Sequence, residues 1–251
     1  MADRYLLESG SPDGYLLEDG SGVYLLDANP ASSTLTDNFD DNSQDTAKWT
    51  VAQFYNSLTT IGGTLTETNQ RVEIAVDAAN NRATGYVSAN YYSLIGDAIY
   101  AKIATAGNAA LVTNQEITLD AGKDSNNYFA AQLVGGNLRI KKLLAGVDTY
   151  SADTTYSSTT HAWWRLREAS GTVFLDTAPS TASNPPVSGD WTNIASIASD
   201  SSVGLDRCKL ALQHATTGAT TSAPNAYFDG FNTAANGAVF AVPRSFGMII
   251  G

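Results

Sequence analysis

The sequence is poor in the residues that most often carry metal or nucleophilic chemistry. Among 251 residues it has one cysteine, Cys208, and two histidines, His161 and His214. A single cysteine excludes an intrachain disulfide and a cysteine-based metal cluster, and it indicates synthesis in a reducing cytosol. The histidines stand alone, and no Gly-x-Ser-x-Gly elbow accompanies them. We therefore expect no metal centre and no cofactor.

Basic residues are also scarce, with 14 Lys and Arg against 25 Asp and Glu and a formal net charge of −11. Phosphate contacts require Lys and Arg, so we expect no nucleic-acid partner. No apolar run reaches the roughly 18 residues of a transmembrane helix, so no membrane partner is expected. The first residues are acidic where a signal peptide has a basic start. The negative charge favours solubility or a partner with a basic surface.

Strong helix formers are few, and Thr, Ser, Ala, Gly, Asn and Tyr dominate the composition. Short apolar runs alternate with polar residues and are separated by Gly, Asn, Asp or Ser, which predicts strands and turns. Gly135-Gly136 and Ser170-Gly171 each lie between two such runs and predict tight hairpins. The sequence therefore predicts an all-β antiparallel β-sandwich. Its core is expected to contain five residues: Trp164, Leu166, Phe174, Leu210 and Leu212.

Four segments follow from the composition. Residues 1–27 are a repeat, residues 28–36 form a Pro/Ser/Thr linker, and residues 37–233 form the sandwich. Residues 234–251 are an apolar C-terminal tail with Arg244 as its one charge. A chain end this apolar is expected to be covered by protein.

The opening segment contains Tyr-Leu-Leu three times, each copy followed by an acidic residue. Extended side chains alternate between faces, so each copy is apolar on both faces. Turn residues between the copies predict a three-stranded meander, which is too small to be stable alone in water. It must pack on its own sandwich or anchor the chain to another subunit. The second interpretation makes nine residues assembly contacts: Tyr5, Leu6, Leu7, Tyr15, Leu16, Leu17, Tyr24, Leu25 and Leu26.

The segment HAWWRLRE offers a ligand-binding candidate. In a strand, Trp164 and Leu166 face the core, and the opposite face presents His161, Trp163, Arg165 and Arg167. An aromatic ring beside a cation suits stacking against a sugar. The alternative is that a neighbouring strand or subunit covers Trp163 while the arginines pair with surface acids. The Tyr91-Tyr92 pair allows the same two interpretations.

Two further clusters have a structural and a functional interpretation. The segment DNFDDNSQD, from Asp37 to Asp45, carries oxygen ligands suited to Ca²⁺ but lacks the glycine and terminal glutamate of a calcium loop; Asx-turns are the alternative. Cys208 lies between Arg207 and Lys209, which would favour a reactive thiolate. Its apolar strand CKLAL favours a buried structural thiol.

Several phrases resemble known families. RYLLESGSPDGYLLEDGSGVYLL, residues 4–26, resembles N-terminal segments of bacteriophage virion proteins. DNFDDNSQDTAKWTV (37–51), HAWWRLREASGTVFLDTAPS (161–180) and NAYFDGFNT (225–233) resemble parts of the concanavalin A-like, or laminin G-like, jelly roll. The resemblance implies a jelly-roll sandwich located in a virion and made in the bacterial host cytoplasm.

Glucanases of this fold carry their carboxylates on a Glu-x-Asp-x-x-Glu strand. The nearest phrase here, from Glu116 to Asp120, lacks the middle Asp and the second Glu. A retaining glucanase needs two carboxylates about 5–5.5 Å apart, so we expect no enzyme.

The first function hypothesis is a non-enzymatic virion structural protein that decorates the capsid or tail. Its partners would be a major capsid or tail protein and other copies of itself in a homo-oligomer. The alternative is a lectin-like, glycan-binding module for host attachment.

Overall fold

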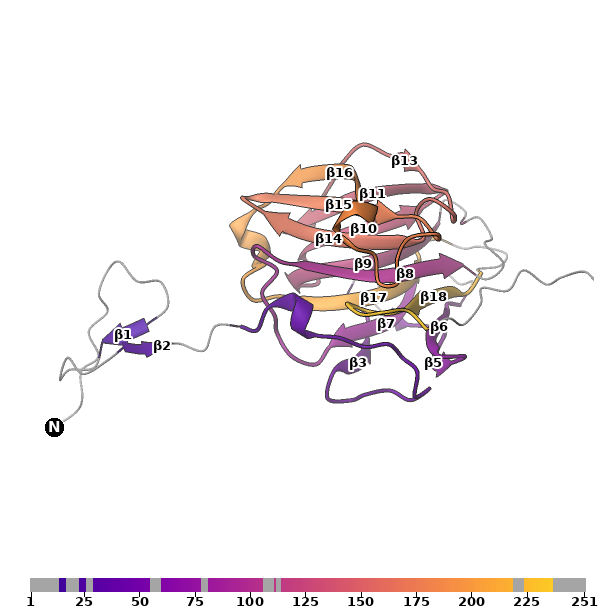
Figure 1. The fold of residues 1–251 in the computed structure, drawn as a ribbon, viewed down its shortest axis with the longest axis horizontal. Helices are drawn as coiled ribbons and strands as arrows, with labels where there is room; N and C mark the ends of the chain where they lie inside the picture. Colours follow the sequence, from indigo (N-terminus) through magenta and orange to yellow (C-terminus); the bar gives the residue numbers. More distant parts are fainter. Residues whose placement is uncertain are drawn as a thin grey trace, which may run out of the picture.

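The computed structural model describes residues 14–16, 23–25, 29–54, 60–77, 81–105, 111, 114–218 and 224–236. Apart from residues 14–16 and 23–25, they form a β-sandwich of two packed sheets, as the sequence predicts (Figure 1). The helices among the described residues are short 3-10 turns: η1 (Ser32–Thr34), η3 (Ser188–Asp190) and η4 (Ser201–Val203). None of the described helices has the length and apolar character needed to span a membrane.

One layer is a nine-stranded sheet. Its strand order is β12 (Val147–Tyr150), β11 (Asn137–Leu144), β10 (Asn127–Val134), β9 (Gln115–Asp124), β17 (Lys209–Thr216), β7 (Arg82–Ser88) and β3 (Trp49–Ala52). Two short strands join this path: β13 (Thr154–Thr155) beside β11 and β4 (Thr60–Ile61) beside β7. The pairing is antiparallel throughout apart from β4 with β7.

The other layer is a seven-stranded antiparallel sheet. Its order is β16 (Thr192–Ala198), β15 (Thr172–Ala178), β14 (Trp163–Ala169), β8 (Ala98–Thr105), β18 (Ala226–Asp229), β6 (Arg71–Ala75) and β5 (Thr64–Thr68). Strands distant in the sequence lie side by side in both sheets, for example β9 beside β17 and β8 beside β18.

Both predicted hairpins are present. Gly135 and Gly136 connect β10 to β11, and Ser170 and Gly171 connect β14 to β15. All four residues have positive φ angles, between 51° and 82°. Two consecutive residues of positive φ match the right-handed twist of the flanking strands, and glycine adopts this conformation without steric cost.

The core lies between the sheets and follows the two-residue alternation of the strands. Trp164, Leu166, Leu210 and Leu212 are fully buried, as predicted. The placement of Phe174 in the core is wrong, because the turn at Ser170-Gly171 pairs Leu166 with Leu175 and Arg167 with Phe174. Phe174 therefore lies half-buried on the outer face, under the Arg167 guanidinium at 4.0 Å.

The described part of the 28–36 segment packs on the sandwich. Leu35 is 3% exposed and belongs to the main core cluster. The Asn232 side-chain amide donates to the backbone carbonyls of Ser32 and Leu35 at 3.0 and 2.9 Å. These contacts make the segment part of the folded domain rather than a spacer.

The other end of the sandwich extends past residue 233. The Asn236 N–H donates to Asp229 at 3.0 Å, and the Asn236 side-chain amide donates to the Asn38 carbonyl. Of the expected C-terminal tail, residues 237–251 lie outside the described residues.

The second and third Tyr-Leu-Leu copies contribute to a hairpin. β1 (Gly14–Leu16) pairs antiparallel with β2 (Val23–Leu25), with Tyr15 opposite Tyr24. The two strands form a sheet of their own, separate from the two sheets of the sandwich. The first copy, residues 5–7, lies outside the described residues.

The acidic segment before β3 contains the predicted Asx-turns. Asp37, Asp41 and Asp45 each accept a hydrogen bond at 3.0 Å from the backbone N–H two residues further on. The interpretation as turn chemistry is confirmed, since these carboxylates organise the approach to Trp49.

Candidate functional site

The predicted platform at Trp163 is not open. The alternation is as expected, since Trp163, Arg165 and Arg167 share the outer face of β14, yet Trp163 is only 2% exposed. It packs against Tyr100, at 6.2 Å between ring centroids, and in a cluster with Ala178 and Ala235. The prediction that Trp163 presents its ring to a ligand is therefore wrong for this structure.

The two arginines bind a neighbouring acid. Arg165 and Arg167 both donate to the same oxygen of Asp176, at 2.8 and 2.6 Å for their closest nitrogens. Burial alone would raise the pKa of Asp176, but hydrogen bonds from Arg167, Asn193 and Arg165 hold it below its usual value. This is the alternative considered for the strand: a covered tryptophan and internally paired arginines.

The last predicted residue, His161, also has an internal partner. Its Nδ1 accepts the Ser157 backbone N–H at 3.1 Å, and its ring lies 6.1 Å from that of Tyr156. Burial lowers the pKa of His161. Three of the four predicted residues thus lie on β14, and His161 precedes it. Arg165, Arg167 and the Nδ1 atom of His161 have internal partners, and Trp163 is covered.

A buried polar network lies on the outer face of the nine-stranded sheet. Asp120 of β9 accepts hydrogen bonds from Thr118 and from the Gln213 amide of β17, both at its Oδ2 atom. Gln213 in turn accepts the backbone N–H of Phe54, whose ring packs on Tyr128 of β10. Phe54 and Tyr128 therefore cover this face above the network.

The carboxylates of Glu116 and Asp120 accept hydrogen bonds from different side chains on the same face of β9. They face the same side of β9 four residues apart, which places their Cα atoms about 13 Å from each other at ~3.3 Å per residue. Glu116 accepts the Gln132 amide at 2.7 Å, and Asp120 belongs to the Gln213 cluster.

Asp120 makes stability depend on pH. Burial raises the pKa of Asp120 to about 7, and its Oδ1 atom has no hydrogen-bond partner. A folded pKa above the unfolded one means that this stabilising contribution is complete below the unfolded value of 3.8 and is lost as pH rises through about 7. Asp120→Asn keeps one oxygen to accept both hydrogen bonds and removes the charge. Between pH 5 and pH 8, wild type should therefore lose free energy of unfolding that the variant keeps. We expect this difference between the two proteins to be about 2 kcal/mol.

Thermal melting of both proteins at pH 5 and pH 8 measures this difference, which corresponds to about 4–8 °C in Tm. Asp153→Asn is the matched control, since the Asp153 side chain is 47% exposed. It should change Tm equally at both pH values. Equal shifts for Asp120→Asn at pH 5 and pH 8 would show that Asp120 is ionised in the fold.

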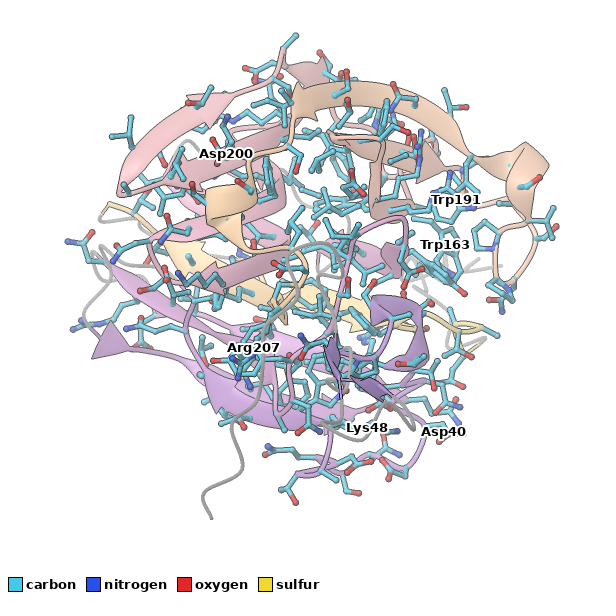
Figure 2. All side chains as sticks on the ribbon, turned by 90° about the vertical axis from the view of Figure 1, so that its left-hand side faces the viewer. Asp40, Lys48, Trp163, Trp191, Asp200 and Arg207 are labelled. Carbon is cyan, nitrogen blue, oxygen red and sulfur yellow. The ribbon has the colours of Figure 1, made fainter. Side chains whose placement is uncertain are left out.

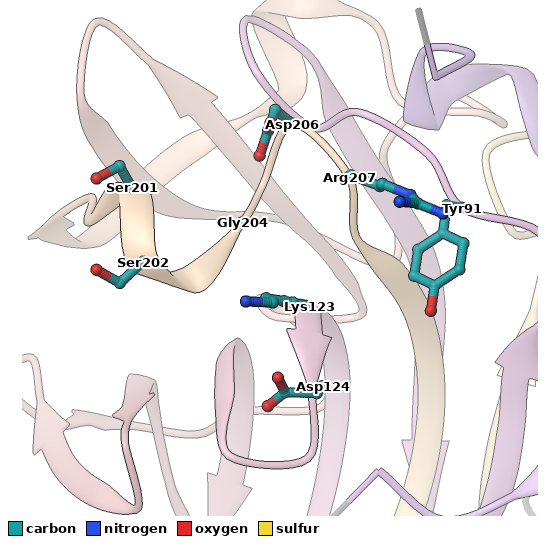
Figure 3. Close-up of a pocket in the computed structure, with 8 residues that line it drawn as sticks. All are labelled: Tyr91, Lys123, Asp124, Ser201, Ser202, Gly204, Asp206 and Arg207. Atoms are coloured by element: carbon teal, nitrogen blue, oxygen red, sulfur yellow. The ribbon is translucent and has the colours of Figure 1, made fainter.

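An open pocket of about 540 Å³ lies at one end of the sandwich (Figure 3). Four chain segments build it: the loop after β7, the end of β9, the η4 turn and the approach to β17. In Figure 3, Lys123 extends into the space between η4 and Asp206, and Arg207 lies beside the Tyr91 ring. The lining residues are Tyr91, Lys123, Asp124, Ser201, Ser202, Gly204, Asp206 and Arg207.

An isolated β-bridge holds Tyr91 at the surface. The backbone groups of Tyr92 and Cys208 exchange two hydrogen bonds of 2.8 Å, and both side chains face the core. Their neighbours therefore face outward: Tyr91 is 38% exposed, with Lys209 Nζ 4.4 Å and the Arg207 guanidinium 4.7 Å from its ring centroid. Of the two tyrosines, the first faces the pocket and the second the core.

The same bridge decides the chemistry of Cys208. The residue is fully buried, and burial raises the pKa of its thiol to about 12. The interpretation as a structural thiol is confirmed, because Arg207 and Lys209 face away from it toward Tyr91.

Gly204 shapes the pocket floor. It ends η4 with φ at 70°, and an added Cβ would lie 3.1 Å from the Lys123 Cβ. Sequence reasoning singled out the Tyr91-Tyr92 pair but missed Lys123, Ser202 and Asp206, because no local pattern links residues so far apart in the chain. Figure 2 shows Arg207 well separated from Trp163 and Trp191, so the pocket is distinct from the predicted platform.

The chain matches no protein-family model and no curated protein. Solved structures share its fold. The CBM2 module of Lactobacillus casei BL23 phage J-1 evolved Dit is similar with a TM-score of 0.55 at 7% identity, covering 77% of this chain and 92% of that one. A Bacteroides ovatus GH16 protein of a mixed linkage glucan locus, in complex with its product, is similar at 0.50 and 10%, covering 78% and 98%.

A third likeness is to the GH43 protein BlXynB from Bacillus licheniformis, with a TM-score of 0.53 and 11% identity. It covers 81% of this chain and 39% of that one. At such identities the likeness establishes the jelly-roll fold alone. This fold is shared by carbohydrate-binding modules and glycan-acting proteins, and one of these neighbours comes from a phage.

Proposed function

We propose that this chain is a non-catalytic, glycan-binding module of a bacteriophage virion. The Tyr91 pocket is the observation that carries the proposal. It combines an exposed aromatic ring with charged and hydroxyl side chains, the combination that recognises the apolar and polar parts of a sugar. Its volume of about 540 Å³ falls within the ~300–1,000 Å³ of small-molecule sites.

The non-catalytic part of the proposal rests on β9. Its two carboxylates, Glu116 and Asp120, lie in separate hydrogen-bond clusters on a buried face. The pocket has Asp124 and Asp206, but Asp124 is occupied by the β9–β10 turn, whose Asn126 N–H and Asn127 amide donate to it at 2.8 and 2.9 Å. A single remaining carboxylate does not supply the acid and base of a glycosidase.

The virion part of the proposal rests on the N-terminal hairpin. Two Tyr-Leu-Leu copies contribute strands that pair with each other in a sheet outside the sandwich. This separation favours an assembly role in which the repeat attaches the chain to a capsid or tail protein, or to further copies of itself. The likeness to a module of a phage Dit supports the same setting.

Tyr91→Ala tests the pocket. On a glycan array followed by calorimetry with the best-binding sugar, we expect the variant to lose at least ten-fold in affinity, or about 1.4 kcal/mol, because a stacking ring is removed. Tyr150→Ala is the matched control: Tyr150 is also exposed, at 41%, and also stacks under an arginine, Arg139 at 3.9 Å. It lies on β12, away from the pocket lining.

The control variant should bind like wild type. Equal affinity of Tyr91→Ala and wild type would remove the pocket from the proposal. Release of reducing sugar from the bound glycan, abolished by Glu116→Gln, would contradict the non-catalytic assignment.

A further inference from the structure

Cations gather at the Tyr91 pocket although the chain is acidic. The sequence has 14 basic residues against 25 acidic ones. Lys123 and Arg207 nonetheless line the pocket. Lys209 is not part of the lining, but its ammonium group lies 4.4 Å from the centroid of the Tyr91 ring. Asp124 and Asp206 also line the pocket, so the existing partners of each charged group decide which charges a ligand meets.

The cations have different tasks. The Lys209 ammonium donates to the carbonyls of Ser88 and Ala89 at 3.0 and 2.7 Å, so it supports the loop that carries Tyr91. Within the described part of the chain, Lys123 and Arg207 take part in no salt bridge. Their charged groups are therefore available at the pocket.

The two lining acids also differ. The Asp124 carboxylate is a hydrogen-bond acceptor in the β9–β10 turn. The side chain of Asp206 is exposed and points into the pocket in Figure 3, and among the described residues it accepts no hydrogen bond. A ligand therefore meets two free cations, one free carboxylate and the hydroxyls of Ser201 and Ser202.

We infer that the pocket binds an acidic carbohydrate, a sugar or polyol chain that carries carboxylate or phosphate groups. The inference rests on the proposed glycan-binding function and names its ligand class. Arg207 and Lys123 receive the anionic group, because charge-assisted hydrogen bonds to carboxylate and phosphate are the strong ones. Asp206 and Ser202 accept or exchange hydrogen bonds with sugar hydroxyls, and Tyr91 contacts the ring.

The two arginines on the outer face of β14 do not compete for this role. Arg165 and Arg167 both bind the buried Asp176, and their guanidiniums stack on Trp191 and Phe174 at 4.4 and 4.0 Å. The Asp176 carboxylate therefore already neutralises part of their positive charge. The Tyr91 pocket offers cations without such a partner.

The test is binding of full-length protein to an array that pairs each acidic glycan with its uncharged counterpart. Uronic-acid oligomers are paired with their methyl esters, and glycerol-phosphate and ribitol-phosphate oligomers with the free polyols. We expect an acidic member to bind at least ten-fold more tightly than its partner and to weaken several-fold between 20 and 300 mM NaCl. The uronate and phosphate arms show which anion is preferred.

Lys123→Gln and Arg207→Gln should each reduce the preference for the acidic member at least five-fold and leave binding of its neutral partner unchanged. Arg139→Gln is the matched control, since Arg139 is a partly exposed cation stacked on Tyr150 outside the pocket. It should retain the full preference. Equal melting temperatures of the three variants and wild type confirm that they fold.

The outcomes separate the two proposals. Binding to neutral glycans that Tyr91→Ala abolishes, with no preference for acidic members, overturns this inference and retains the proposed function. An acidic preference that survives Lys123→Gln and Arg207→Gln also overturns it. No binding to any member overturns the proposed function itself.

Discussion

Replacing Trp49 with alanine is expected to lower the free energy of unfolding by about 3–5 kcal/mol, the usual range for removing a buried tryptophan. Trp49 is fully buried at the start of β3. Its ring stacks on Tyr86, with centroids 5.7 Å apart, and meets Phe231 edge-on at 5.1 Å. Its Nε1–H donates to Asp37 at 2.8 Å.

The expected loss has two sources. The variant leaves a cavity among the rings of Phe39, Tyr86 and Phe231, and it leaves the Asp37 carboxylate without its indole donor. Asp37 also exchanges two backbone hydrogen bonds with Phe231, at 3.0 and 2.8 Å. The substitution therefore weakens the place where the first segment of the domain meets its last strands.

Urea unfolding followed by circular dichroism measures the change. Val51→Ala is the matched control on the same strand, because Val51 is 40% exposed. It should change the free energy of unfolding by no more than about 0.5 kcal/mol. Similar losses for the two variants would mean that β3 has a different register from the one observed.

If the proposed virion role holds, deleting residues 1–27 is expected to leave a sandwich that melts cooperatively but does not attach to the phage particle. The deleted segment includes β1 and β2, which pair with each other and contribute no strand to either sheet of the sandwich. The described core cluster begins at Leu35. Burying one Leu or Tyr contributes about 1.5–3 kcal/mol, so a few buried at each contact would decide attachment.

Two measurements check this expectation: calorimetric melting of the truncated chain, and its co-sedimentation with particles that lack the wild-type protein. A full-length variant with serine in place of the Leu-Leu of each copy is the control for chain length, and it should fail to attach in the same way. Normal attachment of the truncated chain would show that the repeat is not the anchor. Loss of cooperative melting would place the repeat in the core.

Much of the fold follows from local patterns. The hairpins at Gly135-Gly136 and Ser170-Gly171 were predictable because few residue pairs can form a two-residue turn in which both φ angles are positive. Alternation along β14 and β17 correctly placed Trp164, Leu166 and Leu210 in the core. Phe174 was misplaced although its turn was predicted. This turn pairs Phe174 with the outward-facing Arg167, but an apolar residue on a half-buried outer face looks the same in sequence as one in the core.

The candidate site was much less predictable. Alternation separates the two faces of a strand but does not say whether anything covers the outer face. Trp163 has the expected orientation, yet Tyr100 and Ala235 cover it. For Tyr91-Tyr92 the same ambiguity had the opposite outcome, because the bridge to Cys208 turned Tyr92 inward and left Tyr91 exposed.

The sequence by itself determined that this protein is an all-β sandwich, since periodicity and turn residues are local properties of the chain. The tertiary structure alone decided where the candidate pocket lies. It brought Lys123, Asp206 and Arg207 to Tyr91 from separate segments. The physical reason is that strand order and register determine which residues lie side by side in an antiparallel sheet. Here they bring Tyr92 beside Cys208, although the two are far apart in the sequence.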